Sequence, residues 1–348
     1  MKCKKLLFIA LTIFHLGGCY ESGSRKSDDI ASKEELEAQT RNLQDTLADQ
    51  EPGKYTIDSI EGDYVSEGYL KREEGYDWVA VTIKAIGTRE AYISIRSRAD
   101  RKKPTCTFDG IGNIENNGLI KVDFDGKNIL FLSKNNDLRI TTENEDQEDF
   151  LMYFCSGGGN LAGTYKKLED PLDEKQMRPS GFNKSLSLQG ITFDIHASQQ
   201  GSMNILIIQP SGLEIDNRMV AHKIDGNVKD AEIEDLNSDG SPEVLVYIIS
   251  AGSGSYGSVV GYSVNNRKSM SQIYFPPITE NPEISEGYMG HDEFAIIETT
   301  FARRFPIYRE GDTNSNPSGG IRQVQYKLHD GEASRVFKVD KVVEFPNQ

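Results

Sequence analysis

The sequence predicts an all-β protein with two antiparallel β domains, each sandwich- or barrel-like. Short runs alternate apolar with polar residues, as half-buried strands do, and clusters of Gly, Asn and Asp separate them. A stretch containing Pro171, Pro179 and Gly181 divides these runs into two groups. With 348 residues and 37% hydrophobic content, the chain is long enough for two cores.

The N-terminus predicts a lipoprotein signal over residues 1–18. Three lysines precede the apolar segment 6–13, which is too short to span a bilayer, and Leu16-Gly-Gly-Cys19 follows. This ending resembles the bacterial lipobox, which implies cleavage after Gly18 and a lipid on Cys19. An ordinary signal peptide that happens to end in cysteine is the alternative.

Residues 19–54 are rich in Ser, Lys, Asp, Glu and Gln and predict a disordered or partly helical tether. Tyr20, rather than aspartate, follows the lipidated cysteine, which favours the outer membrane of a Gram-negative envelope, facing the periplasm. Multiple acyl chains hold a protein firmly, so we expect it to be anchored to the membrane without spanning it.

The first β domain is predicted at residues 55–168. After Cys3 is removed with the signal and Cys19 is lipidated, Cys106 and Cys155 remain as an even pair in an oxidising compartment, which predicts a disulfide. Two thiols without nearby histidines are too few for a metal site. The predicted strands are 78–83, 91–95, 119–124 and 128–132.

Residues 169–183 are the predicted linker, and 184–348 the second β domain. Its strands include 185–188, 191–195, 204–208, 323–328 and 336–339. Asp330-Gly331 predicts a two-residue hairpin turn between the last two.

A loop of glycine and serine, residues 250–258 (the finger), lies between the strand-like runs 243–249 and 259–264 and reads Ser-Ala-Gly-Ser-Gly-Ser-Tyr-Gly-Ser. It matches the dinucleotide pattern G-x-G-x-x-G, but that motif needs a following helix, and a strand-like run follows here. Neither Ser253 nor Ser255 has glycines at both flanking positions of a nucleophile elbow. The finger is therefore a hairpin tip, and its tyrosine with adaptable hydroxyls favours binding over a turn that only reverses the chain.

A second loop, just before the strand that leads to the finger, predicts a possible calcium site. Asp235, Asn237, Asp239 and Glu243 place oxygen atoms around a turning glycine, as calcium loops do. An EF-hand is excluded because its glutamate belongs at position twelve. The alternative is an Asx-rich turn whose carboxylates face solvent.

The net charge of -15 argues against nucleic-acid binding, which requires a basic surface. Removing residues 1–18 takes away three lysines and no acid, leaving -18. This fits a cationic partner, although surplus acid also keeps secreted proteins soluble. His291-Asp292-Glu293 is not expected to be catalytic, because strand neighbours point to opposite faces and the other histidines are scattered.

Several segments in one order resemble the periplasmic inhibitors of invertebrate-type (I-type) lysozyme of Gram-negative bacteria, over about residues 188–345. The resemblance implies that the part of the finger formed by Ser253, Gly254, Ser255 and Tyr256 enters the lysozyme cleft and that Ser253 and Tyr256 make the contacts. It implies an inhibitor rather than an enzyme, with no required cofactor. The alternative function is a calcium-binding adhesion or glycan-binding lipoprotein. The segments are 207–213, 250–258, 264–269, 287–294, 303–308, 311–314 and 325–328.

Overall fold

A computed structural model describes residues 60–98, 105–115, 118–173, 181–199 and 201–347. It is 56% strand and 9% helix with all sheets antiparallel, so the all-β prediction is confirmed. The signal, Cys19 and the tether lie outside these residues. In the part of the chain that is described, no helix is long and apolar enough to cross a membrane. The domain boundaries stay a prediction.

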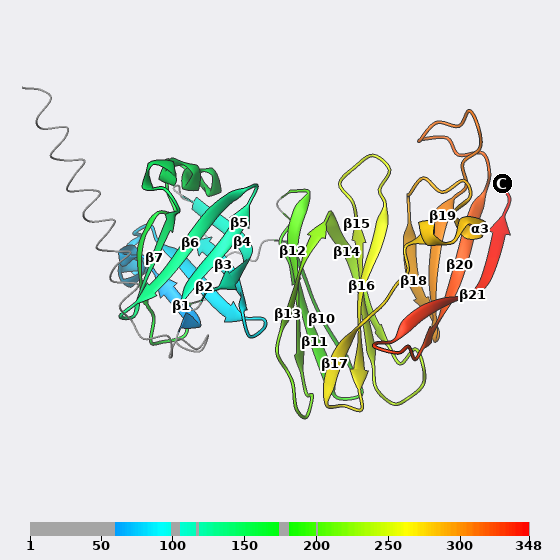
Figure 1. Ribbon diagram of the computed structural model, residues 1–348, viewed down its shortest axis with the longest axis horizontal. Helices are drawn as coiled ribbons and strands as arrows, with labels where there is room; N and C mark the ends of the chain where they lie inside the picture. The colour runs from blue at the N-terminus through cyan, green and yellow to red at the C-terminus, as the bar shows by residue number, and fades with distance from the viewer. Residues whose placement is uncertain (1–59, 99–104, 116–117, 174–180, 200, 348) are drawn as a thin grey trace, which may run out of the picture. The chain divides into compact units, whose positions relative to one another are not determined.

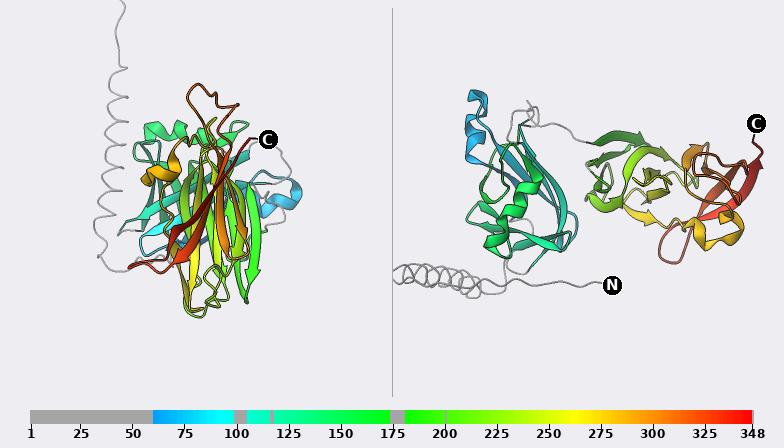
Figure 2. Two further views of the ribbon diagram at one scale, coloured as in Figure 1. Left: turned by 90° about the vertical axis from the view of Figure 1, so that its right-hand side faces the viewer. Right: turned by 90° about the horizontal axis from the view of Figure 1, so that it is seen from above.

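The first region forms an eight-stranded antiparallel barrel, coloured blue to green in Figures 1 and 2. The strands follow the order β3-β2-β1-β9-β7-β6-β5-β4, and pairing between β3 and β4 closes the ring. Closure removes the sheet edges that would otherwise expose unpaired backbone groups. The bounds are β1 Gly62–Val65, β2 Val79–Ala85, β3 Glu90–Ser97, β4 Thr105–Ile114, β5 Leu119–Phe124, β6 Lys127–Lys134, β7 Asp137–Thr142 and β9 Gly163–Lys167.

The barrel interior is filled by side chains, as expected for eight strands. Alternate residues of each strand point inward and form one apolar cluster that includes Val81, Ile93 and Phe131, all completely buried. The two-residue strand β8 (Cys155–Ser156) pairs with β4 and places Cys155 directly opposite Cys106. These cysteines form the predicted disulfide.

The second region contains three four-stranded antiparallel sheets, each a meander in chain order. The sheet β14–β17 shares one apolar core with β10–β13 and another with β18–β21, so it is the middle layer of a stack (Figure 1). The bounds are β10 Phe182–Leu188, β11 Ile191–Ala197, β12 Met203–Ser211, β13 Val220–Asp225, β14 Asn227–Glu234, β15 Glu243–Ile249, β16 Gly257–Asn265, β17 Ser269–Ile273, β18 Glu293–Ile297, β19 Thr300–Pro306, β20 Ile321–His329 and β21 Val336–Phe345, with the short helices η4 (Ile278–Glu280) and α3 (Pro282–Ser285).

The position of strand β15 between two apolar cores explains why its sequence is almost wholly apolar. Val244 and Val246 point into the core shared with β10–β13, whereas Leu245 and Tyr247 point into the core shared with β18–β21. Because successive side chains of a strand alternate between faces, a strand covered on both faces needs apolar residues at every position. β15 therefore holds the finger on a rigid base.

The prediction of a two-residue turn at Asp330-Gly331 was wrong. His329 pairs with Val336, and the connection between β20 and β21 is the six residues 330–335. Arg335 contacts Asp239 in the loop between β14 and β15 and Glu243 at the start of β15. This tertiary contact takes precedence over the local turn preference.

Candidate functional site

The finger is the tip of the hairpin between β15 and β16, as the sequence predicts. Ile249 pairs with Gly257, and the Ser250 N–H donates to the Tyr256 carbonyl at 2.9 Å. The Ser250 hydroxyl oxygen accepts from the Tyr256 N–H at 2.9 Å, and the Ser255 N–H donates to the Gly252 carbonyl at 3.0 Å. These bonds close the loop on itself and give it a defined shape.

The tip of the finger is also bonded to two loops of the third sheet, one before β18 and one between β19 and β20. The N–H of His291 donates to the carbonyls of Gly254 (2.8 Å) and Ser255 (3.1 Å), while the Asn314 side-chain amide donates to the Ser253 carbonyl at 2.8 Å. At Gly290, whose φ is +91°, an added Cβ would lie 2.0 Å from the Gly254 carbonyl oxygen. The finger therefore lies in close contact with the segment before β18.

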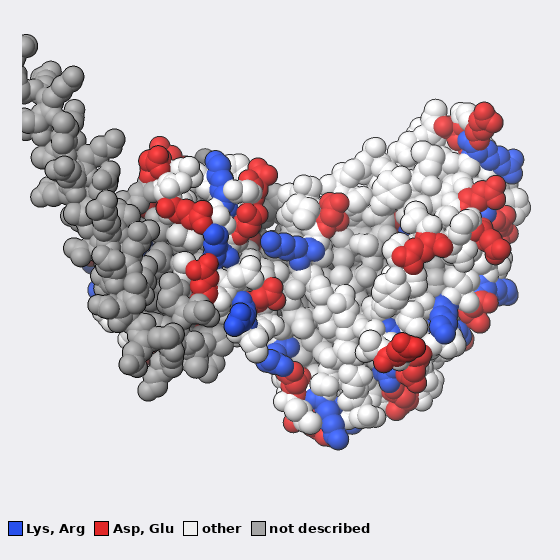
Figure 3. Space-filling model, viewed as in Figure 1, with Lys and Arg blue, Asp and Glu red and all other residues white. Residues whose placement is uncertain are grey.

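These contacts leave the expected binding side chains accessible. Ser253 is exposed, and Tyr256 is 49% exposed with one edge of its ring against Tyr288, at a centroid distance of 5.7 Å. The finger carries no charged residue and forms a white surface in Figure 3, at the tip of the loop between β15 and β16. Its exposed groups are thus hydroxyls and one aromatic ring.

The stem of the finger, where β16 begins at Gly257, is held by a buried ion pair. The Asp292 carboxylate accepts from the Gly257 N–H at 2.6 Å, from the Tyr288 hydroxyl at 2.6 Å and from Arg303 Nε at 2.6 Å. The side chains of Arg303 and Asp292 are 3% and 0% exposed. The environment of the finger is consequently set by β19 and the segment before β18 as much as by its own strands.

Sequence reasoning missed Tyr288, Asp292, Arg303 and Asn314 as partners of the finger. The available signal was their position in the segments 287–294, 303–308 and 311–314, which carry the resemblance. The structure brings these segments together at the finger. The sequence suggested Asp292 only as an acid-base candidate. In the structure, its carboxylate accepts hydrogen bonds from Arg303, Tyr288 and Gly257.

A groove of ≈ 610 Å³ runs beside the finger, and Ser255 and His291 form part of its wall. Its other walls come from β14, β15 and the start of β18, with Tyr247 and Phe294 among them. Acidic residues outnumber basic ones in this lining, which contains Lys229, Asp230, Glu232, Asp292 and Glu293. Asp292 is buried and paired with Arg303, and Asp230 is paired with Lys184, so the groove beside the uncharged finger carries charges of both signs.

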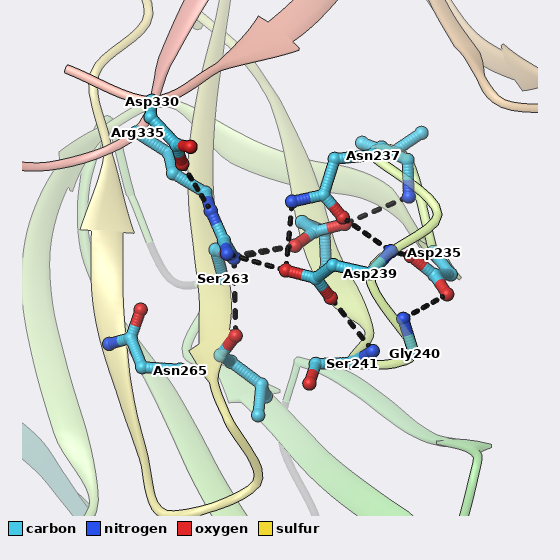
Figure 4. A network of polar contacts seen from close by, with 12 residues as sticks. Asp235, Asn237, Asp239, Gly240, Ser241, Ser263, Asn265, Asp330 and Arg335 are labelled. Atoms are coloured by element: carbon cyan, nitrogen blue, oxygen red, sulfur yellow. Dashed lines mark hydrogen bonds and ion pairs between the residues drawn. The ribbon is translucent and has the colours of Figure 1, made fainter.

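The predicted calcium loop connects β14 to β15 and is closed by its own hydrogen bonds (Figure 4). Asp235 accepts from the N–H groups of Asp239 (3.0 Å) and Gly240 (2.9 Å), and Asp239 accepts from the Ser241 N–H at 2.9 Å. The Arg335 guanidinium pairs with Asp239 and supplies positive charge there. Among the described residues, no group of three or more His, Cys, Asp or Glu side chains could hold a metal ion. These contacts fit an Asx turn better than a calcium site, and calcium binding stays a prediction.

Glu243, the last of the four predicted ligands, is completely buried. Its carboxylate accepts from the Ser263 hydroxyl at 2.6 Å and from the Leu236 N–H at 2.8 Å, and Arg335 lies 3.3 Å away. Burial is the largest influence and raises the pKa of Glu243 to about 7, although these hydrogen bonds and the Arg335 charge act in the opposite direction.

This pKa predicts a pH-dependent stability. Between pH 4.5 and about pH 7, the folded protein retains a proton on Glu243 that the unfolded chain has released, so the free energy of unfolding should fall as pH rises through this window. Glu243→Gln does not titrate, and its difference in unfolding free energy from the parent protein should change with pH. Urea unfolding of both proteins across the window measures this. A difference that is constant with pH would contradict the assignment.

Residues 195–276 match the family of periplasmic lysozyme inhibitors of I-type lysozyme. The resemblance predicted from the sequence is confirmed over this range, which contains β12 to β17 and the whole finger. No curated protein matches the chain. The match supports a role as a lysozyme inhibitor in the periplasm, and the matched family is one of inhibitors.

Proposed function

We propose that this protein inhibits I-type lysozyme by inserting the finger into the active-site cleft. The observation that carries the proposal is the position of the finger within the residues that match the inhibitor family. Its exposed Tyr256 and Ser253, on a loop held by its neighbours, support the same mechanism.

Lysozyme chemistry explains why such a loop would inhibit. Glycoside hydrolysis uses two carboxyl groups that flank the scissile bond. In the proposed complex, the Ser253 hydroxyl donates a hydrogen bond to one of these carboxylates, and Tyr256 fills a sugar site deeper in the cleft. The plug satisfies polar groups of the enzyme while it excludes substrate, without any covalent step.

The net charge of -15 supports a cationic partner. Lysozymes that act on an anionic cell wall are commonly cationic, and charge complementarity raises the association rate of two proteins. We therefore expect association to slow as salt concentration rises. In the cell, the lipid on Cys19 would hold the inhibitor at the outer membrane. There it would face the periplasm, which a lysozyme must enter.

The test uses the soluble form of the protein that begins after Cys19. Its binding and inhibition are measured with an I-type lysozyme, beside chicken-type and goose-type lysozymes as controls. We expect tight binding to the I-type enzyme alone. Inhibition of only a control class would reassign the target, and no binding to any of the three would exclude the proposed function.

A further inference from the structure

The stem of the finger begins β16 at Gly257, where the backbone meets the buried side chain of Asp292. One Asp292 oxygen, Oδ2, accepts from both the Gly257 N–H and the Tyr288 hydroxyl, and the other, Oδ1, accepts from Arg303 Nε. Arg303 Nη2 in turn donates to the Tyr288 hydroxyl at 2.7 Å. The three side chains thus form a closed polar network around one backbone amide of the finger.

Steric fit restricts the stem further. A Cβ at position 257 would lie 2.5 Å from the Asp292 Cβ and 2.5 Å from the Phe294 ring. Glycine is therefore needed for the backbone to come close enough to Asp292 for a short hydrogen bond. The stem cannot move away without leaving a buried carboxylate short of a donor, which is costly in a low-dielectric environment.

We propose that Asp292 is a positioning residue for lysozyme binding. Together with Arg303 and Tyr288, it fixes the stem of the finger at Gly257, so the finger has its binding shape before the partner arrives. This inference rests on the proposed function. A loop that already has its bound shape loses little conformational entropy on binding. If only a fraction of the free molecules hold the finger in the competent shape, the apparent association constant is the intrinsic constant multiplied by that fraction.

Two variants test the network at different strengths. Tyr288→Phe removes the hydroxyl that joins Asp292 to Arg303 but keeps the ring against Tyr256, and Asp292→Asn removes the carboxylate charge. Affinity for I-type lysozyme is measured below the unfolding midpoint of every variant, together with hydrogen exchange at the Gly257 amide. We expect both variants to bind about tenfold more weakly, with faster exchange at Gly257. If Asp292→Asn does not fold, Tyr288→Phe decides.

The barrel offers a matched control. There the Tyr92 hydroxyl donates to Asp109 at 2.6 Å, and Arg96 pairs with the same carboxylate at 2.8 Å, so three identical residue types form a second network. Tyr92→Phe should lower thermal stability yet leave affinity unchanged.

Parent-like affinity of Tyr288→Phe would overturn the positioning role, as would an equal loss in Tyr92→Phe. Tyr256→Ala, measured alongside, separates the two proposals. If it also binds like the parent protein, the proposed use of the finger fails as well; if it alone loses affinity, only the role of Asp292 is wrong.

Discussion

Replacing Tyr256 with alanine is expected to raise the dissociation constant for I-type lysozyme by about thirtyfold or more, a loss of about 2 kcal/mol. The ring is 49% exposed, and its edge contact with Tyr288 holds it in place before binding. Truncation removes the largest apolar surface of the finger and its hydroxyl, while the backbone contacts of Gly254 and Ser255 with His291 remain. Surface plasmon resonance and an inhibition assay measure the effect.

Tyr76 provides the control for this substitution. It lies before β2 in the barrel region and is exposed to the same extent, 49%, so Tyr76→Ala removes a similar side chain without touching the finger. We expect its dissociation constant to equal that of the parent protein. Unchanged inhibition by Tyr256→Ala would remove the finger from the mechanism.

Replacing both Cys106 and Cys155 with serine is expected to lower the free energy of unfolding of the barrel by about 3 to 4 kcal/mol. The bridge joins residues 49 positions apart and restricts the unfolded chain between them. It also ties β8 to β4 at facing positions. Urea unfolding of the double variant, monitored by the fluorescence of the buried Trp78, measures the loss.

Reduction of the parent protein supplies an independent check on the disulfide. Unfolding in the presence of a thiol reductant should give the same stability as the double variant, and the reductant should not affect the variant itself. Equal unfolding free energies for the oxidised parent and the double variant would show that the bridge does not stabilise the fold.

Local sequence pattern was sufficient for much of the fold. Alternating runs located strands such as β5, and the strand-like run 243–249 coincides with β15. The finger was recognised as a hairpin tip because glycines and serines separate two strand-like runs. The disulfide followed from counting cysteines, since only one pair remained available.

The local sequence pattern could not predict contacts between distant segments. The finger depends on Asp292 and Asn314, and its hydrogen bonds with them span 35 and 61 positions of sequence. The turn at Asp330-Gly331 was mispredicted for the same reason, because Arg335 contacts carboxylates of the distant segment 239–243. Strand propensity says nothing about which sheets will pack together.

The sequence by itself determined the all-β class, the position of the finger and the cysteine pair, because these depend on residue type and short-range periodicity. Only the tertiary structure decided that the finger is held by loops beside the third sheet of the stack and that Arg335 meets the predicted calcium loop. The physical reason is that burial of the two apolar faces of β15 brings the sheets together. That packing carries Asp292, Arg303 and Arg335 to partners that no local pattern specifies.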